Sequence, residues 1–184
     1  MAWKKHLREA DVVLAIIGLL LFSFVPPYII CGLFFFITPF YLLTTGRAFL
    51  LKDFCLATIL GFGMTFVFSS FYTYQPAFFG ISLFPLFAWP LGLFTTKLFH
   101  EEWAPKKYSL LSFLIIYWGL LLFEEIVGYH FLGIQNIGTA LYAGLPFCNC
   151  LHAPWFMQLT YLLMGPLYFF ILTLVKKYSN SKRV

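Results

Sequence analysis

Two adjacent glutamates in an apolar segment are the residues whose position most favours chemistry. Glu124 and Glu125 end an uncharged stretch that begins at Ser109, and they lie about 23 Å along the helix predicted there. An acidic side chain in a membrane helix costs about 2.5–3.5 kcal/mol at mid-bilayer, and such residues usually face the bundle or an aqueous cavity. Desolvation favours the neutral acid, which can donate a proton. The alternative is that the pair reaches the outer interface and helps to end the helix.

His130 is the third candidate catalytic residue. It follows Glu125 by five positions, which advance an ideal helix by about 500°, so the two side chains share a face only if the helix opens at Gly128. The competing interpretation is a histidine that makes an ordinary hydrogen bond at the membrane interface.

A Cys-x-Cys-x-His run contains three side chains of the metal-ligating type: Cys148, Cys150 and His152. In an extended segment they point to one side, and zinc would accept two thiolates and an imidazole, with a fourth ligand from His130 or the acidic pair. Structural zinc sites more often space their cysteines by two to four residues. A disulfide is the competing interpretation, either within the run or with Cys31. We expect no metal and no cofactor.

Aromatic side chains are predicted to reach the same end of the molecule as the acids. Tyr72, Tyr74 and Trp89 are the candidate substrate-binding residues among 25 Phe, 11 Tyr and 5 Trp. Bilayer packing and interfacial belts account for most of this excess. A cavity with aromatic walls would suit a polyene or isoprenoid and could stabilise a developing cation.

The composition defines the elements that must position these side chains. Hydrophobic residues make up 61% of the 184 residues and charged residues 10%, whereas soluble domains carry about 25% charged residues. The net charge of +5 comes from short basic clusters between apolar runs, which is typical of topology signals and lipid contacts. We therefore expect an all-α, polytopic transmembrane helix bundle that contacts membrane lipids, and no nucleic-acid partner.

Six spans are predicted in one domain covering residues 1–184. A membrane helix needs about 20 apolar residues, and Pro26-Pro27 divides the first apolar stretch into two short spans, because a proline pair interrupts helical hydrogen bonding. Without that division the count would be five. The predicted spans are about 12–25, 28–45, 54–74, 79–96, 109–128 and 156–175.

The basic residues favour six spans over five. With six, all twelve lie on one side of the membrane; with five, three would oppose the other nine, which the positive-inside rule disfavours. Both termini are thus predicted to be cytoplasmic, in the plasma (inner) membrane, with a long outer loop at 129–155. The acids outside the pair are expected to be solvated partners of Lys and Arg at the inner face: Glu9, Asp11, Asp53, Glu101 and Glu102.

Part of the chain resembles the small polytopic carotenoid-modifying proteins, the membrane lycopene cyclases and carotenoid hydratases. The similarity covers residues 72–130 and consists of Tyr72-Thr73-Tyr74, Gly80-Ile81, Pro85-Leu86-Phe87-Ala88-Trp89 and the acidic pair at a helix end. The cyclases have a Pro-x element before the acids, where this chain has Leu122-Phe123. The resemblance implies that Glu124 or Glu125 protonates a polyene double bond, without a hydride carrier or redox cofactor.

Two functions are therefore predicted as alternatives. The first is acid-base modification of an isoprenoid or another lipid at the outer leaflet, with an apolar small molecule as substrate. The second is a non-catalytic small transporter or membrane partner subunit in which the acidic pair binds a proton or cation. The sequence shows no inverted repeat, which counts against a transporter.

Overall fold

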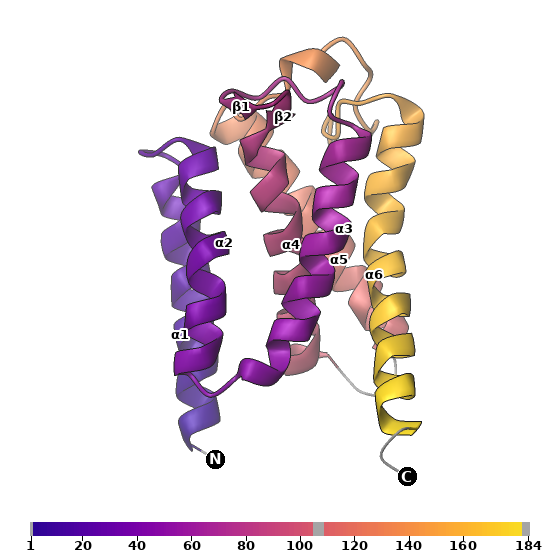
Figure 1. The fold of residues 1–184 in the computed structure, drawn as a ribbon. Coiled ribbons are helices and arrows are strands. Elements are labelled where there is room, and N and C mark those ends of the chain that lie inside the picture. The colour runs from indigo at the N-terminus through magenta and orange to yellow at the C-terminus, as the bar shows by residue number, and fades with distance from the viewer. Residues whose placement is uncertain (1, 105–108, 182–184) are drawn as a thin grey trace.

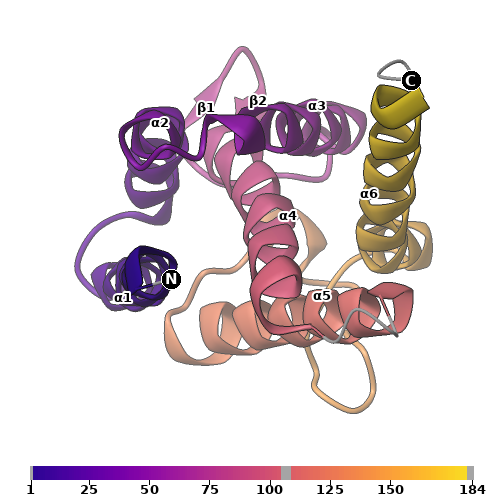
Figure 2. The same cartoon turned by 90° about the horizontal axis from the view of Figure 1, so that it is seen from below.

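The computed structural model describes residues 2–104 and 109–181. It is 73% helix and 2% strand, which confirms the all-α class. The long helices are α1 (Ala2–Leu21), α2 (Pro27–Thr44), α3 (Leu51–Val67), α4 (Leu83–Trp103), α5 (Ser109–Ile126) and α6 (Trp155–Ser181). Helices α1 and α2 lie side by side along the bundle, whereas α4 and α5 are tilted across it (Figure 1 and Figure 2). The short elements are η1 (Ala48–Leu50), β1 (Ala77–Phe78), β2 (Ile81–Ser82), η3 (Val127–Phe131) and η4 (Ile137–Thr139).

Four segments of the described chain are long and apolar enough to cross a membrane. They are Pro27–Thr44, Ala48–Val67, Ser109–Phe131 and Trp155–Tyr178. Helices α1 and α4 lie outside this set, because α1 carries charged residues in its first half and α4 contains two prolines, a lysine and a histidine. The chain is therefore a membrane protein by the length and composition of these four segments.

The first apolar stretch forms two helices, as the proline pair predicts. Helix α1 ends at Leu21 and α2 begins at Pro27, where the fixed φ of proline suits the first helical position and its missing N–H costs no hydrogen bond. The fourth predicted span, 79–96, is wrong at both ends, since α4 covers Leu83–Trp103. The third predicted span is wrong at its end. Helix α3 stops at Val67, and the chain then turns into the antiparallel β1–β2 hairpin before α4. Gly80, with φ +76°, lies in that hairpin, in a conformation that glycine adopts without strain.

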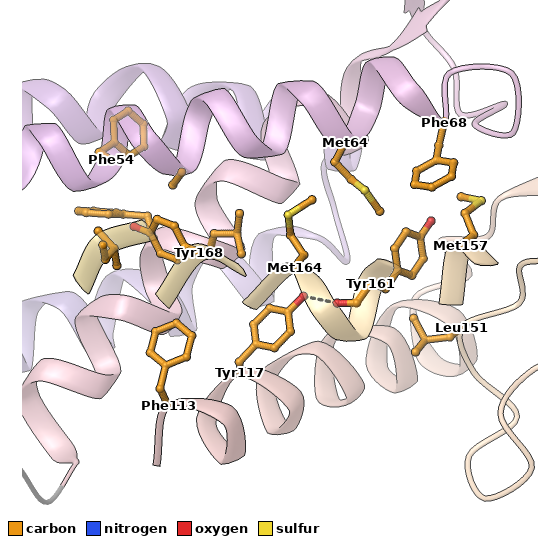
Figure 3. Packing of buried hydrophobic residues seen from close by; sticks show 14 of the residues in the cluster. Phe54, Met64, Phe68, Phe113, Tyr117, Leu151, Met157, Tyr161, Met164 and Tyr168 are labelled. Carbon is orange, nitrogen blue, oxygen red and sulfur yellow. Dashed lines mark hydrogen bonds between the residues drawn. The ribbon is translucent and has the colours of Figure 1, made fainter. Parts of the chain in front are cut away.

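Helix α4 lies at the centre of the bundle and packs against α2, α3, α5 and α6 (Figure 2). Gly61 of α3 allows the backbone to approach the ring of Pro90, and Gly165 of α6 does the same for the ring of Tyr117. Buried aromatic and methionine side chains fill the space between α3, α5 and α6 (Figure 3). Because interiors are close-packed, these small residues set how closely the helices can approach.

Ion pairs join the helices at the end where both termini lie (Figure 1). Lys97 Nζ lies 2.8 Å from the Asp53 carboxylate and 2.7 Å from that of Glu101, which also pairs with Lys176 at 2.8 Å. The prediction that these acids pair with basic residues is confirmed. The prediction that Asp53 is solvated is wrong, because Asp53 is 3% and Lys97 2% exposed. The α3–α4 contact buries both charges, and a buried charge needs such a partner.

A second ion pair attaches α1 to α2. The guanidinium of Arg47 donates two hydrogen bonds to Asp11, at 2.6 and 2.8 Å, and the Tyr41 hydroxyl donates to the same carboxylate at 2.8 Å. The hydrogen bonds to Asp11 raise the pKa of Arg47 above the ordinary value of an arginine, although burial of the guanidinium acts in the opposite direction. This two-point geometry fixes orientation as well as charge.

Candidate functional site

The acidic pair lies in the last turn of α5, directly before a π-helical turn, η3. The wider turn is closed by the hydrogen bond from Leu132 N–H to the Val127 carbonyl, at 3.0 Å. Such π-turns are rare and occur frequently at functional sites. The helix thus opens around Gly128, the position at which the sequence analysis required an opening if Glu125 and His130 were to share a face.

Glu125 lines a small cavity of about 30 Å³ at the end of the bundle opposite the termini. Its other walls come from α6, η3, the segment after α3 and the 132–154 loop: Tyr72, Tyr74, Tyr129, Ile134, Asn136, Thr139, Leu151, His152 and Tyr161. One water needs a volume of about 10–15 Å³ on this scale. The cavity is therefore large enough for about two waters and too small for a polyene.

The three aromatic residues chosen from the sequence lie together beside this cavity. The Tyr72 hydroxyl accepts a hydrogen bond from Trp89 Nε1 at 3.1 Å, and Tyr72 and Tyr74 both form cavity walls. The sequence reasoning missed Tyr161, whose hydroxyl lies 2.8 Å from that of Tyr72. Both phenols are more than nine-tenths buried, so this hydrogen-bonded pair is shielded from water.

His152, rather than His130, is the histidine at Glu125. His130 is exposed and directs Nε2 to the carbonyl of Cys148 at 3.2 Å, outside the residues that line the cavity. His152 is in the cavity wall, interacts electrostatically with Glu125 and stacks on Tyr129, with ring centroids 4.6 Å apart. The predicted topology put both histidines on the outer side with the acidic pair. The sequence reasoning gave the catalytic role to His130 and made His152 only a possible metal ligand, since His152 is 27 positions from Glu125 along the chain.

Both ring nitrogens of His152 face carbonyl oxygens. Nδ1 lies 2.8 Å from the Tyr142 carbonyl and Nε2 lies 3.1 Å from that of Asn149. A carbonyl only accepts hydrogen bonds, so both bonds form together only when each nitrogen carries a proton. Among the described side chains, no Lys or Arg pairs with Glu124 or Glu125.

The cysteines of the Cys-x-Cys-x-His run are joined to each other. Cys148 and Cys150 form a disulfide, whereas Cys31 and Cys55 are free. The two thiolates that a zinc site would need are therefore absent in this state. Within residues 2–104 and 109–181, no group of three or more His, Cys, Asp or Glu side chains is arranged to hold a metal ion.

Glu124 belongs to a different surface from Glu125. Neighbouring residues on a helix point about 100° apart, and the Glu124 carboxylate lies beside Gly92 of α4, 3.9 Å from where a Cβ would stand. It also interacts electrostatically with Cys31 of α2. Glu124 is exposed, while Glu125 is half-buried. The acidic pair therefore directs the Glu124 carboxyl toward α4 and α2 and the Glu125 carboxyl toward the internal cavity.

Asn136 holds the loop over the cavity. Its Oδ1 accepts hydrogen bonds from the N–H and hydroxyl of Thr73, at 2.9 and 3.1 Å, and its Nδ2 donates to the Phe71 carbonyl at 2.7 Å. Gln158 of α6 donates to the carbonyls of Ala143 and Leu151 at 2.8 and 3.0 Å. These contacts position the loop from two sides.

Comparison with known proteins does not assign the chain to a family. No family model, no curated protein and no solved structure matches it.

Proposed function

We propose that the chain is a six-span protein of the plasma (inner) membrane that modifies an isoprenoid or another apolar lipid by acid-base chemistry at the outer leaflet. Both termini are cytoplasmic in this proposal, and the 132–154 loop is outside. The arrangement in Figure 1 supports it, since both chain ends lie at the end of the bundle opposite this loop. The buried ion pairs lie at the cytoplasmic end, where the basic clusters favour that orientation.

One observation carries the proposal: a single helix end presents two carboxyls without a Lys or Arg partner among the described residues, one exposed and one in a polar cavity. An acidic side chain in an apolar segment is costly, and function is the default explanation for it. The exposed carboxyl, Glu124, is the proposed acid that contacts substrate. Gly92 of α4, which has no side chain, lies beside this carboxylate.

The proposed reaction begins with the protonated Glu124 carboxyl. Its proton passes to one carbon of a double bond, the other carbon becomes a carbocation, and the carboxylate remains. Loss of a proton from a neighbouring carbon back to the carboxylate then restores the acid, and the double bond has moved. If a second double bond of the same substrate first attacks the carbocation, a new carbon–carbon bond closes a ring before that proton is lost, and neither route needs a redox step. The cycle consumes no proton, so Glu125 and its cavity would act before the reaction, by exchanging protons between the outer aqueous phase and the acidic pair.

The size of the cavity adds a condition on the substrate. A volume of about 30 Å³ excludes an isoprenoid chain from the Glu125 side, because ligand pockets for drug-sized molecules measure about 300–1,000 Å³. The apolar substrate would therefore lie against the Glu124 side of α5, next to α4 and α2.

The same cavity favours a second candidate function. A space for about two waters with a carboxyl, an imidazole and an amide in its walls suits a proton or small cation better than a lipid. In that case the protein would be a small transporter or partner subunit, and Glu125 would be its binding residue.

Lipid extraction after expression in an isoprenoid-producing host distinguishes the two. We expect a changed isoprenoid profile with the unaltered chain, loss of that change in Glu124→Gln, and unaltered membrane abundance of the variant. Glu9→Gln, an acid at the other end of the molecule, is the matched control and should retain activity. An unchanged lipid profile together with an altered proton or cation flux would reject the enzyme and favour the second candidate.

A further inference from the structure

The disulfide lies in a tight turn, residues 145–151, that is closed by backbone hydrogen bonds. The Leu145 N–H donates to the Cys150 carbonyl at 2.8 Å. The N–H groups of Cys148 and Asn149 both donate back to the Leu145 carbonyl, at 3.2 and 2.8 Å. The Cα atoms of the two cysteines are 5.2 Å apart, so the covalent bond and the hydrogen bonds define one small closed unit.

This turn supplies the backbone groups that hold the ionisable side chains of the site. His130 Nε2 lies 3.2 Å from the Cys148 carbonyl oxygen, and His152 Nε2 lies 3.1 Å from the Asn149 carbonyl oxygen. The Leu151 N–H donates a hydrogen bond to the Glu125 carboxylate. Leu151 and His152 also form part of the cavity wall. A change in the backbone of the turn would therefore alter three side-chain contacts and the wall of the cavity together.

Two residues of the turn have backbone conformations that L-residues rarely adopt. Asn149 has φ +46° and Leu151 has φ +56°. Asparagine tolerates the left-handed region, but a leucine there is strained and persists only where the surroundings impose it. The disulfide encloses Asn149 and ends directly before Leu151, so it constrains Asn149 covalently and Leu151 through the position of Cys150.

We propose that Cys148–Cys150 is a thiol–disulfide exchange site that controls access to Glu125. Its reaction partner is a dithiol, either a small molecule or a redox protein. One thiolate of the dithiol attacks Cys148 Sγ, because Cys148 is half-buried and Cys150 is fully buried. The S–S bond breaks and Cys150 leaves as a thiolate, which takes up a proton.

The second thiol of the dithiol then displaces Cys148 as a free thiol. The dithiol becomes a disulfide and the protein gains two electrons and two protons, so the exchange is balanced. With the turn released, Leu151 leaves its left-handed conformation and its N–H leaves the Glu125 carboxylate. The cavity wall formed by Leu151 and His152 then opens toward the outer aqueous side. The inference rests on the proposed function only in treating Glu125 as part of the site.

Carbodiimide labelling of the full-length protein in native membranes tests the exchange site. Peptide mass spectrometry gives the modified fraction of Glu125 before and after treatment with dithiothreitol, and again after reoxidation with diamide. We expect labelling of Glu125 to rise several-fold on reduction and to return on reoxidation, with Glu9 unchanged as an internal reference. A Cys31→Ser/Cys55→Ser variant should respond like the unaltered protein. A Cys148→Ser/Cys150→Ser variant should be labelled strongly with or without the reductant.

Two results would overturn the exchange site. One is unchanged labelling of Glu125 in protein whose Cys148 and Cys150 are shown by mass to be reduced. The other is recovery of both cysteines as free thiols from membranes that were never reduced. The labelling experiment needs no substrate, so it can succeed when the proposed function fails. If labelling of Glu125 depends on reduction but Glu124→Gln still changes the isoprenoid profile, the proposed function is rejected and the exchange site is supported.

Discussion

Substituting Gly61 by alanine tests how closely α3 and α4 pack. A Cβ at Gly61 would lie 2.5 Å from Cδ and 2.6 Å from the backbone nitrogen of Pro90. The proline ring is joined to the backbone at both ends, so it cannot rotate away as a flexible side chain would. The helices must therefore separate, or the backbone of α4 must bend further at Pro90.

The expected cost follows from two opposing effects. Inserting a methyl group into a packed interior destabilises by about 1–3 kcal/mol, and a contact with a ring fixed to the backbone favours the upper end of that range. Alanine in place of glycine within a helix returns about 0.8–1.0 kcal/mol. We expect Gly61→Ala to lower the free energy of unfolding by about 2 kcal/mol.

Gly63→Ala is the matched control, because Gly63 lies in the same helix, is exposed, and has no atom within 4 Å of a Cβ position. It should stabilise by up to about 1 kcal/mol through helix propensity alone. Both variants can be compared by thermal unfolding in one detergent, where 1 kcal/mol corresponds to a shift of about 2–4 °C for a chain of this size. Equal stability of the two variants would refute the close approach of Gly61 to Pro90.

Two further predictions concern the ion pairs and the topology. Lys97→Met leaves the Asp53 carboxylate buried without its main partner and should destabilise the protein by about 3–5 kcal/mol. Adding Asp53→Asn should restore most of that stability in the same unfolding measurement, and a double variant as unstable as Lys97→Met would contradict the pairing. The topology can be tested in a Cys31→Ser/Cys55→Ser background with an impermeant thiol reagent applied from outside. The reagent should label Leu141→Cys, because the Leu141 side chain is fully exposed, and it should not label Thr45→Cys, which lies beside Arg47. Labelling of Thr45→Cys from outside would reject six spans.

The local signals in the sequence predicted the helical elements well. Helix breaks depend on nearby residues, and Pro26-Pro27 separates α1 from α2 for that reason. The end of α3 was misplaced by seven residues (74 against 67), because the apolar and aromatic residues after Val67 fit a helix and a turn equally well. The position of the acidic pair near a helix end was also a local property, read from the uncharged run before it.

The partners within the site were decided by the tertiary structure. Tyr72 and Tyr161 are 89 positions apart, and Tyr168 donates to the Asp53 carbonyl across 115 positions. Such contacts depend on how each helix is rotated and how far it is shifted along its neighbour, which the periodicity of one helix does not specify. For the same reason the sequence did not show that Lys97 and Asp53 are buried together, or that His152 and not His130 reaches Glu125.

The sequence by itself determined a membrane-embedded helical bundle with two carboxyls in an apolar helix, because hydrophobic length and charge are properties of single segments. Only the tertiary structure decided that these carboxyls face two different surfaces. Neighbouring residues of a helix point about 100° apart. Glu124 therefore points toward Gly92, whereas Glu125 points toward a cavity covered by the disulfide-containing loop. That division follows from the packing of α5 against α4 and α6, since the neighbouring helices determine what each side of α5 meets.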